Sequence, residues 1–121
     1  MTVRIPQHSP ENTLNDISCF LLDIDAFFLV DEWEFEVEWC MCDGTNELSK
    51  GEWEHTQVSN EDFRRVYRST YQTIDGKFVL LSEGRCVATL EVFDSSFWDI
   101  TSSPEFESYM LSKYGPYKFN A

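Results

Sequence analysis

The sequence predicts a single α+β domain, in which an antiparallel, meander-like β-sheet carries two or three packed helices. Three observations predict it. Apolar and acidic residues alternate strictly over 32–41, short β-favouring runs over 71–93 are separated by turn dipeptides, and residues 103–115 form a well-capped helical segment. With 121 residues and 42% hydrophobic residues, the chain is long enough for one core and too short for two domains.

The first thirty residues give a mixed pattern. Residues 1–12 contain polar residues and two prolines, so we expect an irregular lead-in to the domain. Between residues 14 and 30, apolar residues recur at the spacing of a helix, at Leu14, Ile17, Leu21, Ile24 and Phe28. The same segment also alternates apolar residues with Asp23 and Asp25, as a strand does. We expect a helix at its start and a strand towards its end.

Residues 32–41 carry the clearest pattern of the sequence. Every second residue is acidic or a cysteine, in the order Glu32, Glu34, Glu36, Glu38 and Cys40. This pattern is typical of a half-buried strand whose other residues face the core, here Trp33, Phe35, Val37, Trp39 and Met41. The four glutamates then share the opposite face, about 7 Å apart along the strand. We name these four residues the glutamate ladder.

Turn residues divide the middle of the chain. Asp43-Gly44 predicts a turn, and residues 46–51 a loop. Asp75-Gly76 predicts a hairpin between strands at 71–74 and 77–81, and Glu83-Gly84 predicts a turn into a strand at 86–93.

Capping residues predict two helices in the second half. Ser59 followed by Asp62 favours a helix start, and the residues that would share one face are Phe63, Val66, Tyr67, Thr70 and Tyr71. The end of this segment fits a strand equally well. The last helix has Ser103 as N-cap, Pro104 at its first position and Gly115 beyond its end.

Charge is distributed very unevenly along the chain. The net charge is −13, and residues 11–62 hold fifteen acids but a single base, Lys50. Such self-repulsion destabilises a compact state unless something positive docks there, so we interpret the acidic half as a surface for a basic partner. Phosphate is repelled by this half, so we expect no direct contact with nucleic acid. Arg64, Arg65 and Arg68 are expected to form the polar face of a helix and to pair with acids of this chain.

We expect a protein of the cytoplasm. The N-terminal residues lack the apolar run and cleavage site of an export signal. The longest apolar stretch, residues 19–30, is interrupted by two aspartates and is too short for a bilayer core of about 30 Å. In that compartment the four cysteines are expected to be reduced thiols: Cys19, Cys40, Cys42 and Cys86.

Residues 20–25 are the sharpest catalytic candidate. The run Phe20-Leu21-Leu22-Asp23-Ile24-Asp25 resembles the first motif of haloacid-dehalogenase-type phosphatases. That resemblance implies Asp23 as nucleophile and Asp25 as acid/base at a strand end, with Mg²⁺. The sequence departs from the family after Asp25, where Ala26-Phe27-Phe28 follows, and it offers no second acidic pair after a glycine. We therefore expect two solvent-facing aspartates instead, with a magnesium-dependent phosphatase as the lesser alternative.

Other chemistry is less well supported. Structural zinc sites need a two-to-four-residue gap and a second ligand pair, whereas Cys40-x-Cys42 with His55 offers neither. Alternation places both thiols on the face of the glutamate ladder. Neither His8 nor His55 adjoins a nucleophile motif. We expect no metal, no cofactor and no enzyme activity.

In size, charge and architecture the whole chain resembles the immunity proteins that neutralise bacterial toxins, such as nuclease bacteriocins and toxins of contact-dependent growth inhibition. The resemblance rests on no diagnostic motif. It implies an antitoxin-like toxin inhibitor acting through protein–protein interaction, with a basic, cognate nuclease toxin as partner. Acidic and aromatic residues are expected to form the interface, namely Asp31, Glu32, Glu34, Glu36, Glu38, Glu52, Trp53, Glu54 and Trp98, with Trp53 or Trp98 as anchor.

The alternative is a mimic of nucleic acid that inhibits a host DNA-binding protein or nuclease, in the manner of anti-restriction or anti-CRISPR proteins. Here the spaced carboxylates would stand in for phosphates. A mimic competes with DNA for its target, whereas an immunity protein binds one cognate toxin. A solvated strand face with no binding role is the third interpretation of the glutamate ladder.

Overall fold

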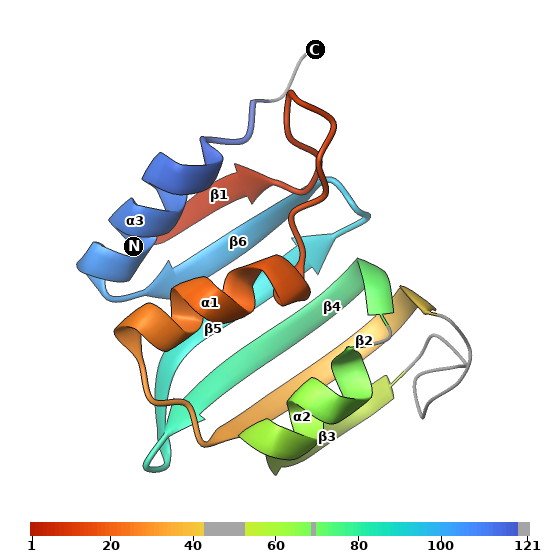
Figure 1. The fold of residues 1–121 in the computed structure, drawn as a ribbon, viewed down its shortest axis with the longest axis vertical. Helices are drawn as coiled ribbons and strands as arrows, with labels where there is room; N and C mark the ends of the chain where they lie inside the picture. Colours follow the sequence, from red (N-terminus) through yellow and green to blue (C-terminus); the bar gives the residue numbers. More distant parts are fainter. Residues whose placement is uncertain (43–52, 69, 119–121) are drawn as a thin grey trace.

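The computed structural model describes residues 1–42, 53–68 and 70–118 (Figure 1). In these residues the strands are β1 (Thr2–Pro6), β2 (Glu32–Cys42), β3 (Trp53–Ser59), β4 (Thr70–Ser82), β5 (Arg85–Phe93) and β6 (Phe97–Ser102). The helices are α1 (Ile17–Phe27), α2 (Asn60–Tyr67) and α3 (Pro104–Tyr114).

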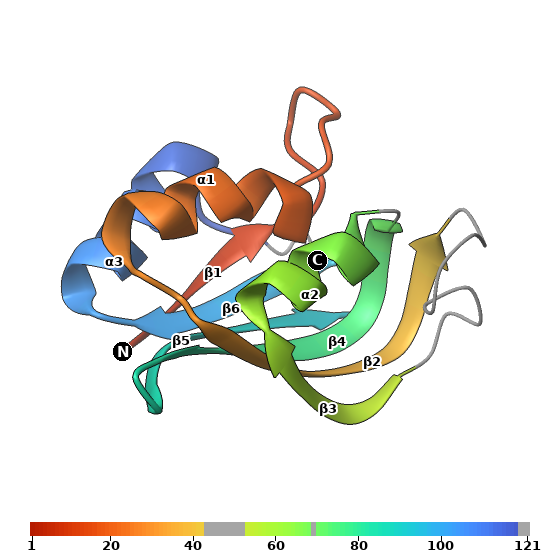
Figure 2. The same cartoon turned by 60° about the horizontal axis from the view of Figure 1, so that its bottom comes forward.

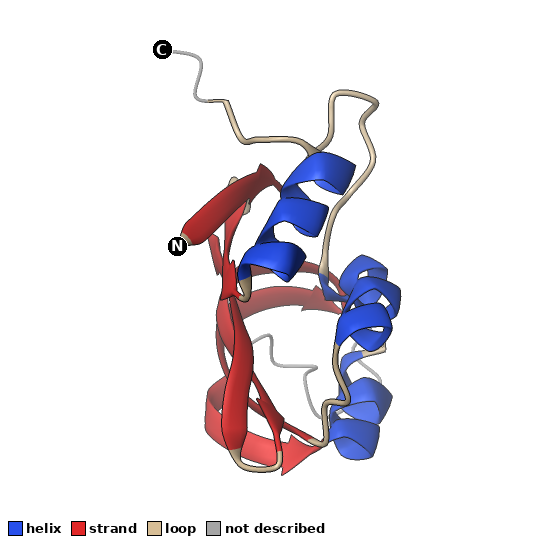
Figure 3. Cartoon of the chain, turned by 90° about the vertical axis from the view of Figure 1, so that its left-hand side faces the viewer, coloured by secondary structure: helices blue, strands red, loops and turns tan. Residues whose placement is uncertain are grey.

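The strands form one antiparallel sheet in the order β1-β6-β5-β4-β2-β3. Strands β4, β5 and β6 are consecutive in sequence and adjacent in the sheet, so they form a meander. Its strands differ from the predicted ones, because residues 71–81 lie in one strand and β6 was not predicted. All three helices lie on one face of the sheet, as Figure 3 shows. The predicted α+β class is therefore confirmed. The opposite face, which no described helix covers, we name the open face.

The prediction of an irregular lead-in over residues 1–12 was wrong, because residues 2–6 form the edge strand β1. Val3 and Ile5 alternate with polar residues, and Ile5 is fully buried. The strand pairs with β6, so that Thr2 lies opposite Thr101. A partner so far along the chain leaves no local trace in the sequence. Pro6 is tolerated at the end of an edge strand.

The expected strand at the end of residues 14–30 was also wrong, because the helix α1 continues to Phe27. The Asp16 side chain caps the helix by accepting a hydrogen bond from the Ile17 N–H (2.7 Å). Ile17, Phe20 and Ile24 follow helical spacing and are fully buried. Asp23 falls on this buried side, so the apolar–acidic alternation was accidental.

The predicted hairpin at Asp75-Gly76 does not form, because β4 runs through both residues from Thr70 to Ser82. Gly76 is needed there for close approach between strands. A Cβ atom at Gly76 would lie 3.3 Å from the Glu36 carbonyl oxygen of β2 and 3.1 Å from the Thr73 methyl carbon. The glycine therefore allows β4 and β2 to approach closely, which is one of the roles of glycine inside a sheet.

The predicted turn at Asp43-Gly44 and the loop over residues 46–51 lie outside the described residues. The other turn and cap predictions are confirmed. Glu83 and Gly84, both with positive φ, turn the chain from β4 into β5. Ser59 caps α2 and Ser103 caps α3, which begins at Pro104 and ends before Gly115. Thr70 belongs to β4 rather than α2, so the strand alternative for this position holds.

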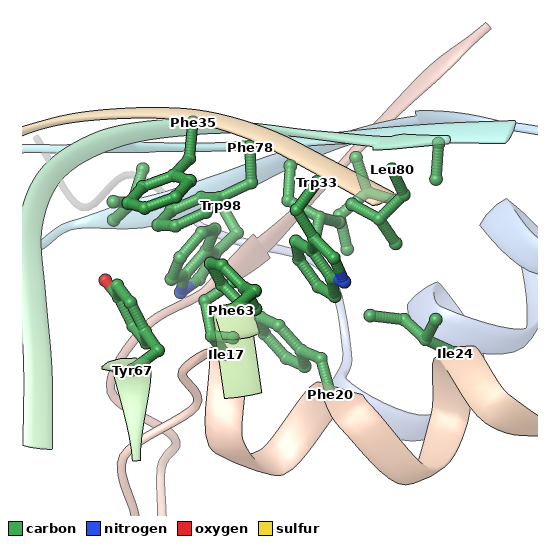
Figure 4. Close-up of a cluster of buried hydrophobic side chains, with 14 of the residues drawn as sticks. Ile17, Phe20, Ile24, Trp33, Phe35, Phe63, Tyr67, Phe78, Leu80 and Trp98 are labelled. Carbon is green, nitrogen blue, oxygen red and sulfur yellow. The ribbon is translucent and has the colours of Figure 1, made fainter. Parts of the chain in front are cut away.

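Aromatic rings dominate the core between the sheet and the helices (Figure 4). Trp33 of β2 stacks on Phe63 of α2 with ring centroids 3.9 Å apart. Phe20 of α1 meets Trp98 of β6 edge-on at 5.3 Å. Rings bury large apolar areas in fixed geometries, so they help a domain of this charge to stay folded.

The sheet is strongly curved. Figure 2 shows β2 and β4 curling towards the helices at one end, with β3 following the same curve. The helices therefore sit on the concave side, and the open face is convex. The curl begins where Gly76 brings β4 close to β2 and where the pairing of these strands changes register, between Val37 and Trp39.

Candidate partner-binding face

The glutamate ladder lies on the open face, as the alternation predicts. The side chains that alternate with it, Trp33, Phe35 and Val37, are buried against the helices. Glu32 and Glu34 are half-buried between neighbouring strands, whereas Glu36 and Glu38 are exposed. The carboxylates therefore run in a row over the convex side of the sheet.

Cross-strand register shows what surrounds the ladder. Glu36 of β2 lies opposite Lys77 of β4, which in turn lies opposite Glu91 of β5. On the other side, the His55 Nε2 atom of β3 is 3.5 Å from a Glu34 carboxylate oxygen. Asp75 of β4 adds a further acid beside Glu36 and Glu38. Towards the β1 edge, Arg4 and Asp99 form a bidentate pair with N–O distances of 2.7 and 3.0 Å.

Positive charge does not balance the ladder. The Arg4 guanidinium is already paired with Asp99, so Lys77 is the one described lysine or arginine of this face left beside the ladder. No described residue forms an ion pair with Glu36 or Glu38 within 4.0 Å. The centre of the open face therefore carries uncompensated negative charge.

Two shallow hollows lie along the ladder and share Glu36 and Lys77. One, of about 210 Å³, is bordered by Glu34 and His55. The other, of about 260 Å³, is bordered by Glu38, Glu91 and Phe93. Together the two hollows form depressions in the acidic surface into which basic side chains fit.

The predicted facing of residues 39–41 was wrong, because β2 contains a register shift between Val37 and Trp39. Trp39 and Met41, expected in the core, are 58% and 45% exposed, and Cys40, expected on the ladder face, is 4% exposed. An extra residue in a strand reverses the facing of everything that follows it. The shift therefore adds two large apolar side chains to the end of the ladder.

Trp98 is not a surface anchor. Its side chain is fully buried, and its Nε1–H donates to the Asn15 carbonyl oxygen at 2.9 Å. Trp98 lies opposite the buried Val92 of β5, on the side of the sheet that faces the core. The exposed tryptophan beside the acids is Trp39. Sequence reasoning missed it because an unbroken alternation gives no sign of a bulge.

The other predicted interface residues divide into two groups. Asp31 precedes β2 and has a structural role, because one of its carboxylate oxygens accepts the Glu83 N–H at 3.0 Å and holds the β4–β5 turn. Glu52 lies outside the described residues. Trp53 and Glu54 belong to β3, but their side chains are outside the described set.

Asp23 and Asp25 do not form the strand-end pair of a phosphatase, because both lie within α1. The buried Asp23 carboxylate accepts hydrogen bonds from Tyr109, Lys113 and Tyr114 of α3, with the Lys113 Nζ at 2.6 Å. Burial and the Asp23 carboxylate raise the pKa of Tyr114 above its usual range. Asp25 pairs with both terminal nitrogens of Arg64, at 2.6 and 3.1 Å. The expectation of two solvent-facing aspartates was therefore wrong for Asp23.

Arg64 and Arg65 lie on α2 and pair with acids of this chain, as expected, whereas Arg68 is the C-cap and forms no ion pair with a described residue. Arg64 joins α2 to α1 through Asp25, and Arg65 lies 3.9 Å from an Asp62 oxygen. Cys40 and His55 lie on opposite sides of the sheet, and Cys42 has no described side chain. Within the described residues, no group of three histidine, cysteine or acidic side chains is arranged to hold a metal ion.

Comparison with known proteins gave no match to a family model, to a curated protein or to a solved structure. Among the described residues, none of the helices has the length and apolar character needed to cross a membrane.

Proposed function

We propose that this protein binds and neutralises a basic protein through its open face, and that the partner is a bacterial nuclease toxin for which this chain is the immunity protein. The observation that carries the proposal is the uncompensated glutamate ladder, which runs along a convex surface and ends at the exposed Trp39 and Met41.

The contrast with acids elsewhere supports a binding role for the ladder. Asp16, Asp23 and Asp25 are each engaged by donors inside the protein, as is Glu107, which accepts the Ser102 N–H at 2.9 Å. Glu36 and Glu38 are engaged by no described residue. Like charges at successive positions of one face destabilise a sheet, so their retention favours an external partner.

Shape and composition support the kind of partner. A nuclease that handles a polyanion has a concave, basic cleft, and a convex acidic surface is complementary to it in both respects. Trp39 and Met41 add apolar area at the edge of the charged zone. Aromatic anchors surrounded by charged groups are typical of tight interfaces.

The first experiment is a pull-down from cells that co-express the neighbouring reading frames, at low and high salt. A single basic protein encoded next door, with nuclease activity that this chain suppresses, is the expected result. Recovery of assorted DNA-binding proteins that DNA displaces would instead favour the nucleic-acid mimic. If no protein is recovered at low salt, both the immunity-protein proposal and the nucleic-acid mimic are contradicted.

The second experiment reverses the ladder. In Glu34→Lys/Glu36→Lys/Glu38→Lys we expect the association rate with the captured partner to fall by at least about tenfold at low salt and to lose most of its salt dependence. The matched control, Glu11→Lys/Glu61→Lys/Glu105→Lys, changes the net charge equally at exposed positions off the open face. Stopped-flow fluorescence measures both. Equal association rates for the two variants would show that the open face is not the binding surface.

A further inference from the structure

The two edges of the sheet are unlike. At the β1 edge, the segment after α3 runs beside the strand, and the Tyr117 N–H donates to the Arg4 carbonyl oxygen at 2.9 Å. The Tyr117 ring also packs on Phe97, with centroids 5.0 Å apart. The other edge is β3, whose one neighbour among the described strands is β2 (Figure 1). An edge strand presents one row of backbone N–H and C=O groups to its surroundings.

Register identifies the residues whose backbone faces outwards. The Asn60 N–H donates to the Asp31 carbonyl oxygen at 2.8 Å, in line with the pairing of Glu34 with Gln57 further along the same ladder. Hydrogen-bonded pairs alternate with non-bonded pairs in antiparallel sheets, so Val58 bonds to β2 and its neighbour Gln57 does not. The backbone groups of Gln57 therefore point away from the sheet, whereas at His55 the register shift opposite Glu36 interrupts the alternation. No described residue pairs with Gln57 on its outer side.

This free edge is continuous with the glutamate ladder. A strand added beside β3 would lie two strand spacings, about 10 Å, from β2. On the open face its side chains would stand next to His55 and Gln57, whose side chains already reach Glu34 and Glu32 at 3.5 and 3.4 Å. Long basic side chains at these positions can reach the same two carboxylates.

On the other side of the same edge, the apolar Val58 and the half-buried Thr56 lie opposite buried rings of β2. Val58 is half-buried and packs against the core beneath α2. Residues of an added strand that point to this side would extend the contact with Val58. A matching segment therefore has basic residues at every second position and apolar residues between them, because successive strand residues point to opposite faces.

We infer that β3 is a docking edge, at which the partner adds an extended segment of alternating basic and apolar residues as a further strand of the sheet. This rests on the proposed function in assuming a basic partner, and it states how that partner is held. Main-chain hydrogen bonds fix the segment, and the ladder selects its charge. A second copy of this chain is a poor occupant, because pairing β3 with β3 would join two glutamate ladders on one face.

The test uses a nine-residue capped peptide of alternating lysine and valine as probe, with a peptide of the same residues in clustered order as control. Amide chemical shifts and hydrogen exchange of the full chain are followed by NMR. We expect the Gln57 amide to shift with the alternating peptide and to exchange at least about tenfold more slowly, as it acquires a hydrogen-bond acceptor. No change at this amide would overturn the inference.

A pair of variants isolates the main-chain contact. Gln57→Pro removes an N–H that does not bond to β2, at an edge position where proline is tolerated after an extended residue. Gln57→Ala removes the side chain and keeps the N–H. We expect roughly tenfold weaker peptide binding for Gln57→Pro, the effect of one lost hydrogen bond and an unpaired acceptor, and less than about twofold for Gln57→Ala. Equal binding by the two variants would refute strand addition.

These outcomes separate the inference from the proposed function. If Gln57→Pro binds the pulled-down partner as well as the wild type does, while the ladder reversal does not, the open face binds without strand addition. If sedimentation shows that the free chain is a dimer whose contacts protect the Gln57 amide, a second copy occupies the edge and the inference is wrong. The exchange measurement uses the wild-type chain, so it stands even if Gln57→Pro is unstable.

Discussion

Trp39 and Trp98 allow binding to be separated from folding at the level of single residues. Trp39 exposes more than half of its surface beside the ladder, whereas Trp98 is fully buried and hydrogen-bonded. We expect Trp39→Ala to change the free energy of unfolding by less than about 0.5 kcal/mol, and Trp98→Ala to lower it by about 3–5 kcal/mol. Urea titration followed by circular dichroism measures both values.

Trp39→Ala also tests whether Trp39 anchors the interface with the partner. If Trp39 contributes to the interface, Trp39→Ala weakens binding of the captured partner by at least about tenfold, the effect of a modest hot spot. Unchanged affinity, with unchanged stability, would remove Trp39 from the interface and leave the ladder to act alone.

Asp16 gives the protein a pH-dependent term in its stability. Its carboxylate is buried and accepts hydrogen bonds from the Ile17 and Thr73 backbones and from the Thr73 hydroxyl. Burial outweighs these contacts and raises the pKa of Asp16 to about 6. The folded chain therefore binds a proton that the unfolded chain releases above pH 4, so this stabilising term is present at low pH and lost as the pH rises through 6.

Asp16→Asn removes this term. We expect the stability of the wild type relative to the variant to fall by on the order of 2 kcal/mol between pH 4 and pH 7. Urea titrations at a series of pH values measure it, and the comparison cancels the titration of the other acids. A difference that rises with pH would show that the hydrogen bonds to the carboxylate outweigh its burial.

At the level of elements, Asp23 joins α1 to α3. One buried carboxylate holds three donors from successive turns of α3, and the exposed Asp25 holds Arg64 of α2. We expect Asp23→Asn to lower the free energy of unfolding by about 1–3 kcal/mol, because it leaves donors without an ionised acceptor. The control Asp25→Asn should cost less than about 1 kcal/mol, since that pair is half-exposed. Similar losses of unfolding free energy in Asp23→Asn and Asp25→Asn would mean that the burial of Asp23 does not make its contacts more stabilising than those of Asp25.

The elements also differ in how far the sequence could predict them. The α3 caps and the Glu83-Gly84 turn depend on residues within a few positions, and both were predicted. β1 depends on β6, and the bulge in β2 depends on the approach of Gly76 from β4. Contacts of that range are absent from local patterns, so Gly76 was taken for a turn and residues 2–6 for a lead-in. The acidic part of the site was predictable because it depends on local alternation. Its aromatic end was not, because the exposure of Trp39 depends on the bulge in β2.

For the whole molecule, self-repulsion is the dominant electrostatic effect. The chain carries a net charge of −13, and the ladder concentrates part of it on one face. We expect the melting temperature to rise when sodium chloride is increased from 20 to 500 mM, because salt screens the repulsion between exposed like charges that lie farther apart than the Debye length, about 10 Å at 0.1 M. In Glu34→Lys/Glu36→Lys/Glu38→Lys the melting temperature at low salt should be higher than in the wild type, with a smaller salt response. Scanning calorimetry tests this, and a triple variant no more stable at low salt would show that the ladder carries no such cost.

The pairing of β1 with β6 also has a consequence for the order of events during synthesis. Thr2 leaves the ribosome almost a hundred residues before Thr101, the residue opposite it in the sheet. Until then β1 has no neighbour and α1 lacks the α3 residues that hold Asp23. The β4–β5 hairpin, which is local, can assemble earlier, and closing the sheet by pairing β1 with β6 is a late step of high contact order. During that interval both flanks of the sheet are open, and the nascent chain has the greatest need of protection from other unfinished chains.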